Sequence, residues 1–127
     1  APLDGGWSPE DHLAHITAWE RFALHYAIRG EPAHLALGVT PEQVEAWDID
    51  AINAAVVAAT AGQSLAETLA TFHAVHAELR AAVAALNWAE WHGQMHVVEG
   101  YPPEPRLMWI AGNSYEHYLE HWSWLPV

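Results

Sequence analysis

Apolar positions along this chain recur at helical spacing, and few segments show the strict alternation of a strand. The clearest pattern lies in residues 64–86, where apolar side chains recur at alternating steps of four and three residues. Its members are Leu65, Leu69, Phe72, His76, Leu79, Val83 and Leu86. Such a stripe is typical of the inner seam of a helical bundle. We therefore expect a long helix here whose apolar face packs on neighbouring helices.

Capping residues place the ends of the predicted helices. Four pairs match the capping-box pattern, in which a Ser, Thr or Asn is followed three residues later by an acid or amide: Ser8 with Asp11, Thr40 with Gln43, Ser64 with Glu67, and Asn113 with Glu116. Pro9 and Pro41 occupy first helical positions, and Gly30 and Gly62 are stop signals. Together these signals predict helices over residues 9–29, 48–61, 64–86 and 106–124, and a short turn at residues 41–46.

Two irregular segments separate the predicted helices. Residues 30–40 contain Pro32 and Gly38 and are expected to form a loop. Residues 87–105 are rich in aromatic residues, Gly and Pro, with room for one short strand at residues 95–98. A connector of this length often forms a lid or a pocket wall, although it can also simply cover one end of a bundle.

Three more stripes, two in the first helix and one in the last, complete the architecture. In the first helix one stripe contains His12, His15, Trp19, Phe22 and Tyr26, and a neighbouring one contains Leu13, Ile16, Glu20 and Ala23. In the last helix the stripe contains Leu107, Ile110, Ser114, His117, His121 and Trp124. An antiparallel bundle of about four helices buries such stripes. We predict an all-α protein in which residues 1–127 form a single domain.

Histidine stands in these seams where Leu would be expected, at His15, His76, His117 and His121. His117 and His121 are four residues apart, so both rings leave the same helix face and suit two neighbouring positions on one metal. With His15 they predict a three-histidine metal centre that keeps a coordination position open for water or substrate. The alternative is that each is a neutral, hydrogen-bonded core residue. Other histidines are expected to be more exposed: His12 and His73 as half-exposed neighbours of the seam residues, His25 and His34 at the surface or in loops.

The net charge of the chain limits the kinds of molecule that it is expected to bind. The chain has 127 residues, four Arg and no Lys, sixteen acidic residues and a formal charge of −12. Nucleic acid, anionic membrane surfaces and strongly anionic substrates are therefore excluded as favoured partners. No apolar run approaches the roughly 20 residues of a membrane span, and no signal-peptide pattern is present, which favours the cytoplasm. With no Cys, the chain has neither a thiolate ligand nor a thiolate nucleophile.

Glu20 is the candidate catalytic carboxylate, because it lies on the second stripe of the first helix. It would orient a ligand imidazole, act as general base on a bound water, or be solvated at the rim of the bundle, and the rim is the preferred interpretation. Trp19 and Phe22, with aromatic residues of the connector, are expected to line a substrate pocket, and His76 is a core residue placed to face it.

Three segments resemble the ClbS/DfsB family within the DinB-like superfamily. They are residues 6–16 (GWSPEDHLAHI) with Trp19 and Glu20, residues 50–53 (DAIN), and residues 112–121 (GNSYEHYLEH). The resemblance implies a DinB-like four-helix bundle and a divalent metal, commonly zinc or nickel, held by His15, His117 and His121. Relatives usually have another helix of about 25 to 30 residues before the Gly-Trp-Ser motif, whereas only residues 1–5 precede it here. Either the chain is a fragment, or the helix expected at residues 48–61 or a partner subunit covers the exposed seam, and we expect a homodimer.

Three functional hypotheses follow. The first is a metal-dependent small-molecule enzyme, a hydrolase or a detoxification or self-resistance protein that acts on an electrophile, with a thiol as an alternative nucleophile. The second is a non-catalytic protein that binds or sequesters a small molecule in the same aromatic cavity. The third is a structural bundle whose histidines are hydrogen-bonded core residues.

Overall fold

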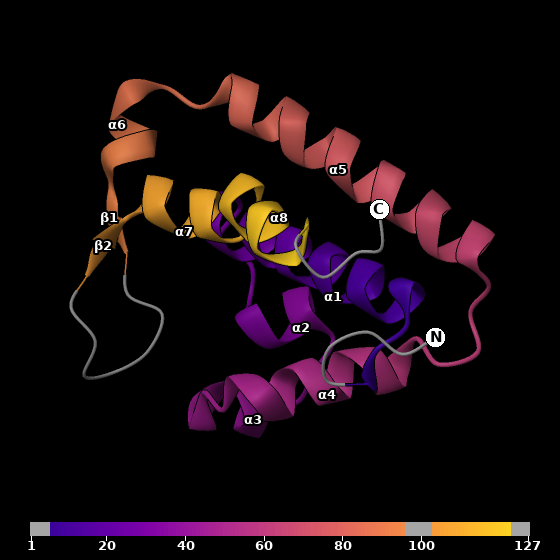
Figure 1. The fold of residues 1–127 in the computed structure, drawn as a ribbon. Helices are drawn as coiled ribbons and strands as arrows, with labels where there is room; N and C mark the ends of the chain where they lie inside the picture. The colour runs from indigo at the N-terminus through magenta and orange to yellow at the C-terminus, as the bar shows by residue number, and fades with distance from the viewer. Residues whose placement is uncertain (1–5, 96–102, 123–127) are drawn as a thin grey trace.

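The computed structural model describes residues 6–95 and 103–122, which are almost entirely helical (Figure 1). The helices are α1 (Pro9–Arg21), η2 (Phe22–Ile28), α2 (Ala33–Leu37), α3 (Pro41–Ala46), α4 (Ile49–Ala59), α5 (Leu65–Ala85), α6 (Trp88–His92), α7 (Arg106–Gly112) and α8 (Tyr115–Trp122). Two short strands, β1 (Gln94–Met95) and β2 (Glu104–Pro105), pair in antiparallel fashion. The predicted all-α class is confirmed.

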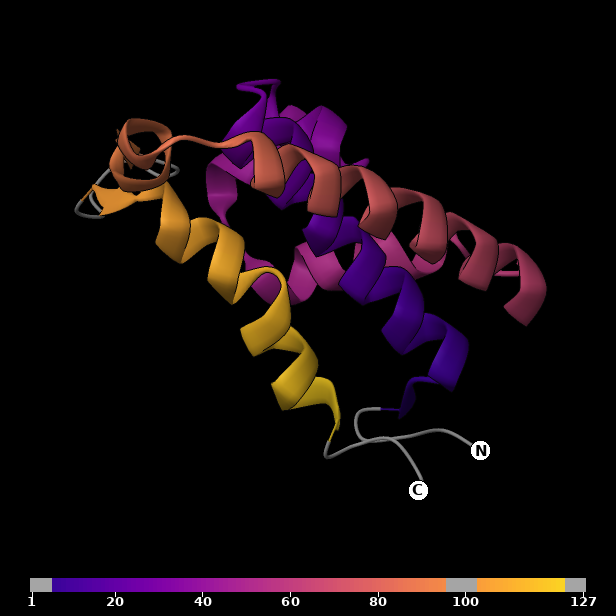
Figure 2. The same ribbon diagram turned by 90° about the horizontal axis from the view of Figure 1, so that it is seen from above.

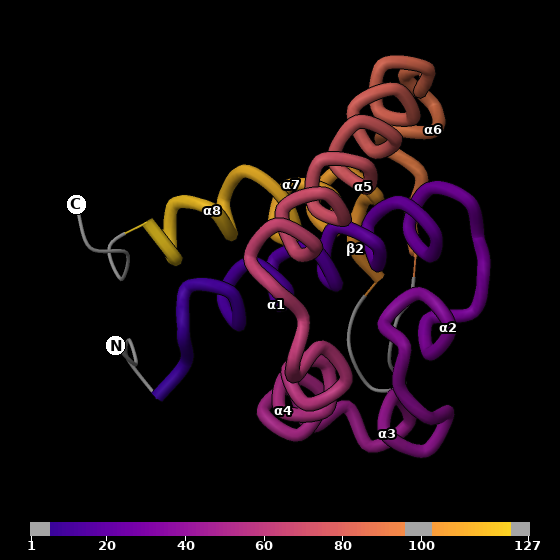
Figure 3. Tube along the Cα trace, turned by 90° about the vertical axis from the view of Figure 1, so that its right-hand side faces the viewer, coloured from indigo at the N-terminus to yellow at the C-terminus, as the bar shows by residue number. Residues whose placement is uncertain are grey.

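The first helix occupies the centre of the fold. α1 contacts α5 along its length, α4 on another side and α8 near its beginning, while η2 packs on α2, α5 and α7. Figure 1 shows α3 and α4 on one side of α1, with α5 on the other, and Figures 2 and 3 show the same arrangement from two further directions. Side chains of α1 therefore reach neighbours on several sides.

Helix ends follow the capping signals with one exception. The capping boxes at Ser8, Thr40 and Ser64 are all formed, with hydrogen bonds in both directions. The uninterrupted helix expected over residues 106–124 is wrong, because the chain turns between α7 and α8. At this turn Asn113 Nδ2 donates to the Trp109 carbonyl at 2.6 Å. A short polar side chain that bonds to nearby backbone in this way competes with the helix, and here it accompanies the break.

Both segments expected to be irregular contain short helices. α2 lies within the predicted loop and ends at Gly38, whose φ of 70° places it in the left-handed region that glycine adopts without strain. α6 begins at a capping box formed by Asn87 and Glu90. The strand predicted at residues 95–98 is formed at residues 94–95, and residues 96–98 lie outside the described chain.

The core lies where α1 and η2 meet α2, α4 and α5. One buried cluster contains Ala18, Trp19, Phe22, Leu37, Ile52 and Val56, and a second contains Ala23, Leu24 and Leu79. Each large apolar side chain buried here contributes about 1.5–3 kcal/mol to stability. η2 is a π-helix, in which three successive residues, 22–24, are buried. Arg106 secures this segment, because its Nε donates to the Ala27 carbonyl at 2.6 Å.

The apolar seam of α5 is less buried than the sequence predicts. In the whole of α5 only Thr68 and Leu79 are buried, and of these two only Leu79 belongs to the seam. Leu65 and Leu69, also seam residues, are exposed. Leu119 of α8 is also exposed. The seam is therefore partly uncovered in the single chain, and the homodimer remains a prediction. None of the described helices combines the length and apolarity needed to cross a lipid bilayer.

Candidate metal centre

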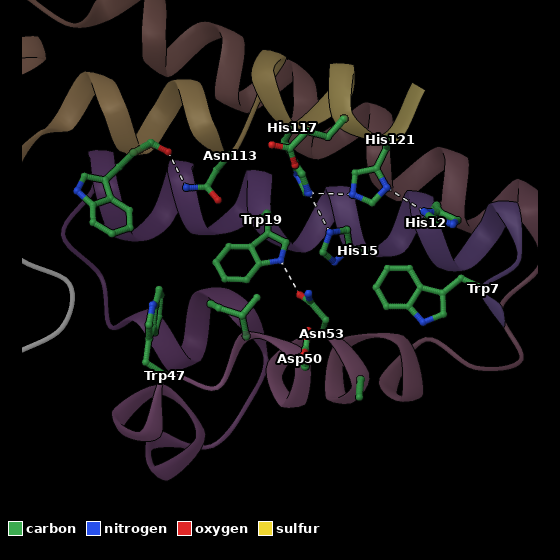
Figure 4. A pocket seen from close by; sticks show the side chains of 14 residues that line it. Trp7, His12, His15, Trp19, Trp47, Asp50, Asn53, Asn113, His117 and His121 are labelled. Carbon is green, nitrogen blue, oxygen red and sulfur yellow. Dashed lines mark hydrogen bonds between the residues drawn. The ribbon is translucent and has the colours of Figure 1, made fainter. Parts of the chain in front are cut away.

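The three histidines predicted as ligands lie together between α1 and α8 (Figure 4). His15 Nε2 is 2.9 Å from His117 Nε2, which is in turn 3.0 Å from His121 Nε2. The ring centroids of His15 and His121 are 4.8 Å apart. All three side chains are buried, because α8 presents one face to α1 and the spacing of four residues places both of its rings on that face.

His12 is a fourth member of the cluster. The sequence predicted a half-exposed neighbour, but the side chain is only 2% exposed, and its Nδ1 is 2.8 Å from Nδ1 of His121. Trp7 closes the cluster, with its ring 5.2 Å from that of His12 and 5.0 Å from that of His15. The signal that marks His12 is its position three residues before His15 on one helical stripe, because such residues share a helix face.

Burial keeps these imidazoles uncharged. Desolvation lowers the pKa of His15 to about 3, and the positive charges that His117 and His121 would carry lower it further, while the side chain of Asn53 opposes the shift. Burial also lowers the pKa values of His117 and His121 to about 4 each. At neutral pH each ring therefore offers an unprotonated nitrogen, which is the form that binds a metal.

The donor set fits a divalent metal. Nitrogens bound to one zinc at about 2.0–2.1 Å lie roughly 3.3 Å apart in tetrahedral geometry, close to the two short separations in the cluster. If Nε2 of His121 binds the metal, its Nδ1 carries the proton and donates to Nδ1 of His12. His12 thus supports one of the ligands, and the arrangement suits a centre with an open coordination position.

A cavity of about 760 Å³ opens beside the cluster, and all four histidines line it. Trp7, Trp19, Trp47 and Trp109 provide aromatic walls, and Asp50, Asn53, Asn113 and Glu120 provide the polar ones. The indole nitrogen of Trp109 is buried without a hydrogen-bond partner among the described residues. A cleft of this size and composition suits a small molecule.

Trp47 is held in this wall in a strained conformation. Its φ of 46° lies in the left-handed region, which costs a non-glycine residue on the order of 1–3 kcal/mol. Packing holds it there, since its ring lies 6.2 Å from that of Trp19 and 6.0 Å from that of Phe22. Such strain often accompanies functional sites.

The two aromatic residues predicted to line the pocket have different positions. Trp19 lines the cavity, and its Nε1 donates to Asn53 Oδ1 at 2.9 Å. Phe22 is fully buried behind it and packs in the core rather than in the cavity wall. Of the expected connector aromatics, Tyr101 lies outside the described residues, whereas Trp91 lines a different cavity.

Glu20 and His76 pair with each other rather than with the cluster. Glu20 is completely buried, so the rim position preferred from the sequence is wrong. Its Oε1 lies 2.8 Å from Nδ1 of His76 on α5. Burial raises the pKa of Glu20, and the hydrogen bond to His76 opposes that shift. Neither residue lines the cavity beside the histidine cluster.

Comparison with known proteins yields one match. A family model described as the DinB superfamily matches residues 1–124. No match was found among curated proteins or among solved structures.

Proposed function

The chain belongs to the DinB superfamily, and from this premise we propose that it is a metal-dependent enzyme acting on a small molecule. DinB proteins often bind metal, and three buried histidines here have the geometry to hold an ion. The observation that carries the proposal is the convergence of His15, His117 and His121 at the wall of a cavity large enough for a substrate. The proposed metal is zinc or nickel.

The residues around the centre have separate tasks in this proposal. A divalent metal in such a centre lowers the pKa of a coordinated water toward neutrality and polarises an electrophile. His12 bonds to Nδ1 of His121 and fixes that ring, and the Nε2 atoms of His15, His117 and His121 converge on one position. The buried side chains of α1 and α8 shield the ligands from bulk water.

The cavity selects the substrate. Its indole walls bind an apolar or aromatic body. Among the described residues its charged lining consists of Asp50 and Glu120 besides the histidines, without any Arg. A neutral electrophile therefore suits this site better than an anion does. Within the superfamily we place the chain in the ClbS/DfsB branch, as a hydrolase or a detoxification or self-resistance protein.

Two alternatives share the same cavity. A thiol cosubstrate in place of water would make the protein an S-transferase. A protein that binds its ligand without turnover would be a sequestering bundle, an alternative favoured by the extent of the aromatic lining. Neither alternative changes the metal ligands, so they are separated by the reaction rather than by the metal.

Turnover of model electrophiles tests the proposal. Untagged protein, stripped with chelator and reloaded with Zn²⁺ or Ni²⁺, is incubated with an activated aryl ester and an aryl epoxide, with and without a thiol. We expect metal-dependent product formation that His117→Ala abolishes. The matched control is His73→Ala, which removes an exposed histidine of α5. Binding of these compounds without turnover in any metal form would contradict the enzyme and favour sequestration.

A further inference from the structure

A second cavity lies between α5, α6, α7 and α8, and its described lining residues differ from those of the cavity beside the histidines. It measures about 490 Å³, within the range of small-molecule sites. Its walls are mainly apolar, formed by Leu79, Val83, Ala84, Trp91, Leu107, Ile110 and Ala111. A ligand here would bury an apolar body, and this site does not depend on the metal centre.

The imidazole of His76 lies in the wall of this second cavity and contacts several neighbouring side chains. The ring of Phe72 is stacked on that of His76, with centroids 5.4 Å apart and planes at 21°. Nδ1 of His76 bonds to Glu20, and the Tyr118 hydroxyl lies 3.4 Å from the same nitrogen. Both hydrogen-bonding contacts involve Nδ1, so Nε2 is the other ring nitrogen of His76. Because His76 lines the cavity, this nitrogen is the one available to a ligand.

The buried carboxylate of Glu20 affects how the His76 imidazole can interact with a ligand. Oε1 of Glu20 bonds to His76, and Oε2 has no hydrogen-bond partner among the described residues. Burying a carboxylate is costly unless it is paired, so the contact with Nδ1 of His76 stabilises Glu20. A cationic imidazole donates from both ring nitrogens, so in that form Nε2 would donate to an anionic ligand while Nδ1 stays on Glu20.

Arg80 places a second positive group beside His76. It lies four residues further along α5, so the two side chains share one helix face, and both line the cavity. Arg80 is exposed and makes no hydrogen bond or ion pair with any described residue, although the chain has sixteen acidic residues to four Arg. The other polar residues of the lining are Ser114, Tyr115 and Tyr118, so the part of the lining that the structure describes contains no carboxylate. A guanidinium above an apolar cavity suits an amphipathic anion.

We propose that this cavity binds a small apolar carboxylic acid, with its carboxylate held by Arg80 and His76 and its hydrocarbon body packed against Leu79, Val83 and Ile110. The net charge of −12 repels anions from most of the protein surface. Recognition of a carboxylate therefore depends on these two groups, and an uncharged analogue loses their contribution.

Paired probes test the proposal by calorimetry. 1-Naphthylacetate is titrated into the metal-stripped chain, and 1-naphthylacetamide, which has the same ring system without the charge, is titrated in parallel. We expect micromolar to millimolar binding of the acid, and binding of the amide that is at least tenfold weaker. Arg80→Met keeps the aliphatic stem and removes the charge, and it should weaken binding of the acid at least tenfold. Arg29→Met removes one charge elsewhere, at a residue that pairs with Glu78, and should change binding less than twofold.

Further measurements separate this cavity from the metal centre. His117→Ala should leave binding of the acid within twofold of the parent, because His117 does not line the second cavity. Arg80 is exposed, so its variant is expected to fold, and a melting curve checks this. Equal binding of acid and amide, binding unaffected by Arg80→Met, or binding lost with His117→Ala would each overturn the proposal. Absence of binding at millimolar acid would do the same.

Discussion

Removal of His117 gives the sharpest test of the metal centre, because this side chain links the other two ligands. Its Nε2 lies within 3.0 Å of both His15 and His121, which come from different helices. His117→Ala leaves one ligand on α1 and one on α8. Two imidazoles without the third hold a divalent metal far more weakly, since a protein zinc centre generally needs three or four ligands.

The expected effect follows from binding linkage. A metal at a hundred times its dissociation constant stabilises the folded state by about 2.7 kcal/mol when it does not bind the unfolded chain. For a chain of 127 residues, 1 kcal/mol shifts the melting temperature by roughly 3–5 °C, so the parent should gain about 10 °C. His117→Ala should gain less than about 2 °C under the same conditions.

Thermal melts followed by circular dichroism measure this shift in untagged protein, first with chelator and then with excess Zn²⁺ or Ni²⁺. His73→Ala is the control, because it removes an exposed histidine of α5 and lowers the histidine count equally. It should keep the full shift. A parent with no shift and no stoichiometric metal, or a His117→Ala variant that gains as much as the parent, would refute the three-histidine centre.

Three other outcomes are expected. Because the pKa values of the cluster imidazoles are lowered from 6.5 to between about 3 and 4, the unfolded chain binds more protons below pH 6.5. The metal-free fold should therefore lose at least about 1 kcal/mol between pH 7 and pH 5 by urea titration, and a flat profile would contradict neutral buried rings. Glu20→Ala should destabilise the fold by about 1–3 kcal/mol in the same assay, because His76 loses a buried partner, whereas exposed Glu78→Ala should cost less than about 0.5 kcal/mol. Arg106→Met should speed hydrogen exchange in residues 22–28, since Arg106 bonds to the Ala27 carbonyl, and unchanged exchange would show that packing alone holds the π-helix.

Much of the helical pattern could be predicted because its signals are local. Ser8, Thr40 and Ser64 cap helices through neighbours three residues away, and those bonds form in the structure. The break between α7 and α8 does not follow from the apolar stripe, which continues through it, and the capping pattern at Asn113 is its local signal. An apolar stripe shows which residues face inward. It does not reveal a turn after which the following residues still face the same side.

The histidine cluster could be predicted for a similar reason, since seam positions on two helices must meet in the interior. The environment of His12 depends on Trp7 and α8 packing over it, and a count of helical positions does not contain that information. Glu20 illustrates the same limit. A carboxylate on a helix is usually solvated, and only the contact with His76 on α5 explains its burial.

The positions of His15 and Glu20 explain why one helix serves two separate sites. Five residues of α-helix correspond to a rotation of about 140° after one full turn, so their side chains leave α1 on nearly opposite sides. His15 meets α8, and Glu20 meets α5. On α8 the adjacent residues His117 and Tyr118 are divided in the same way, one toward the cluster and the other toward His76. The bonds of His15 and of Glu20 thus lead to different helices, and substitutions in one site should add to substitutions in the other without coupling beyond about 0.5 kcal/mol, unless α8 itself moves.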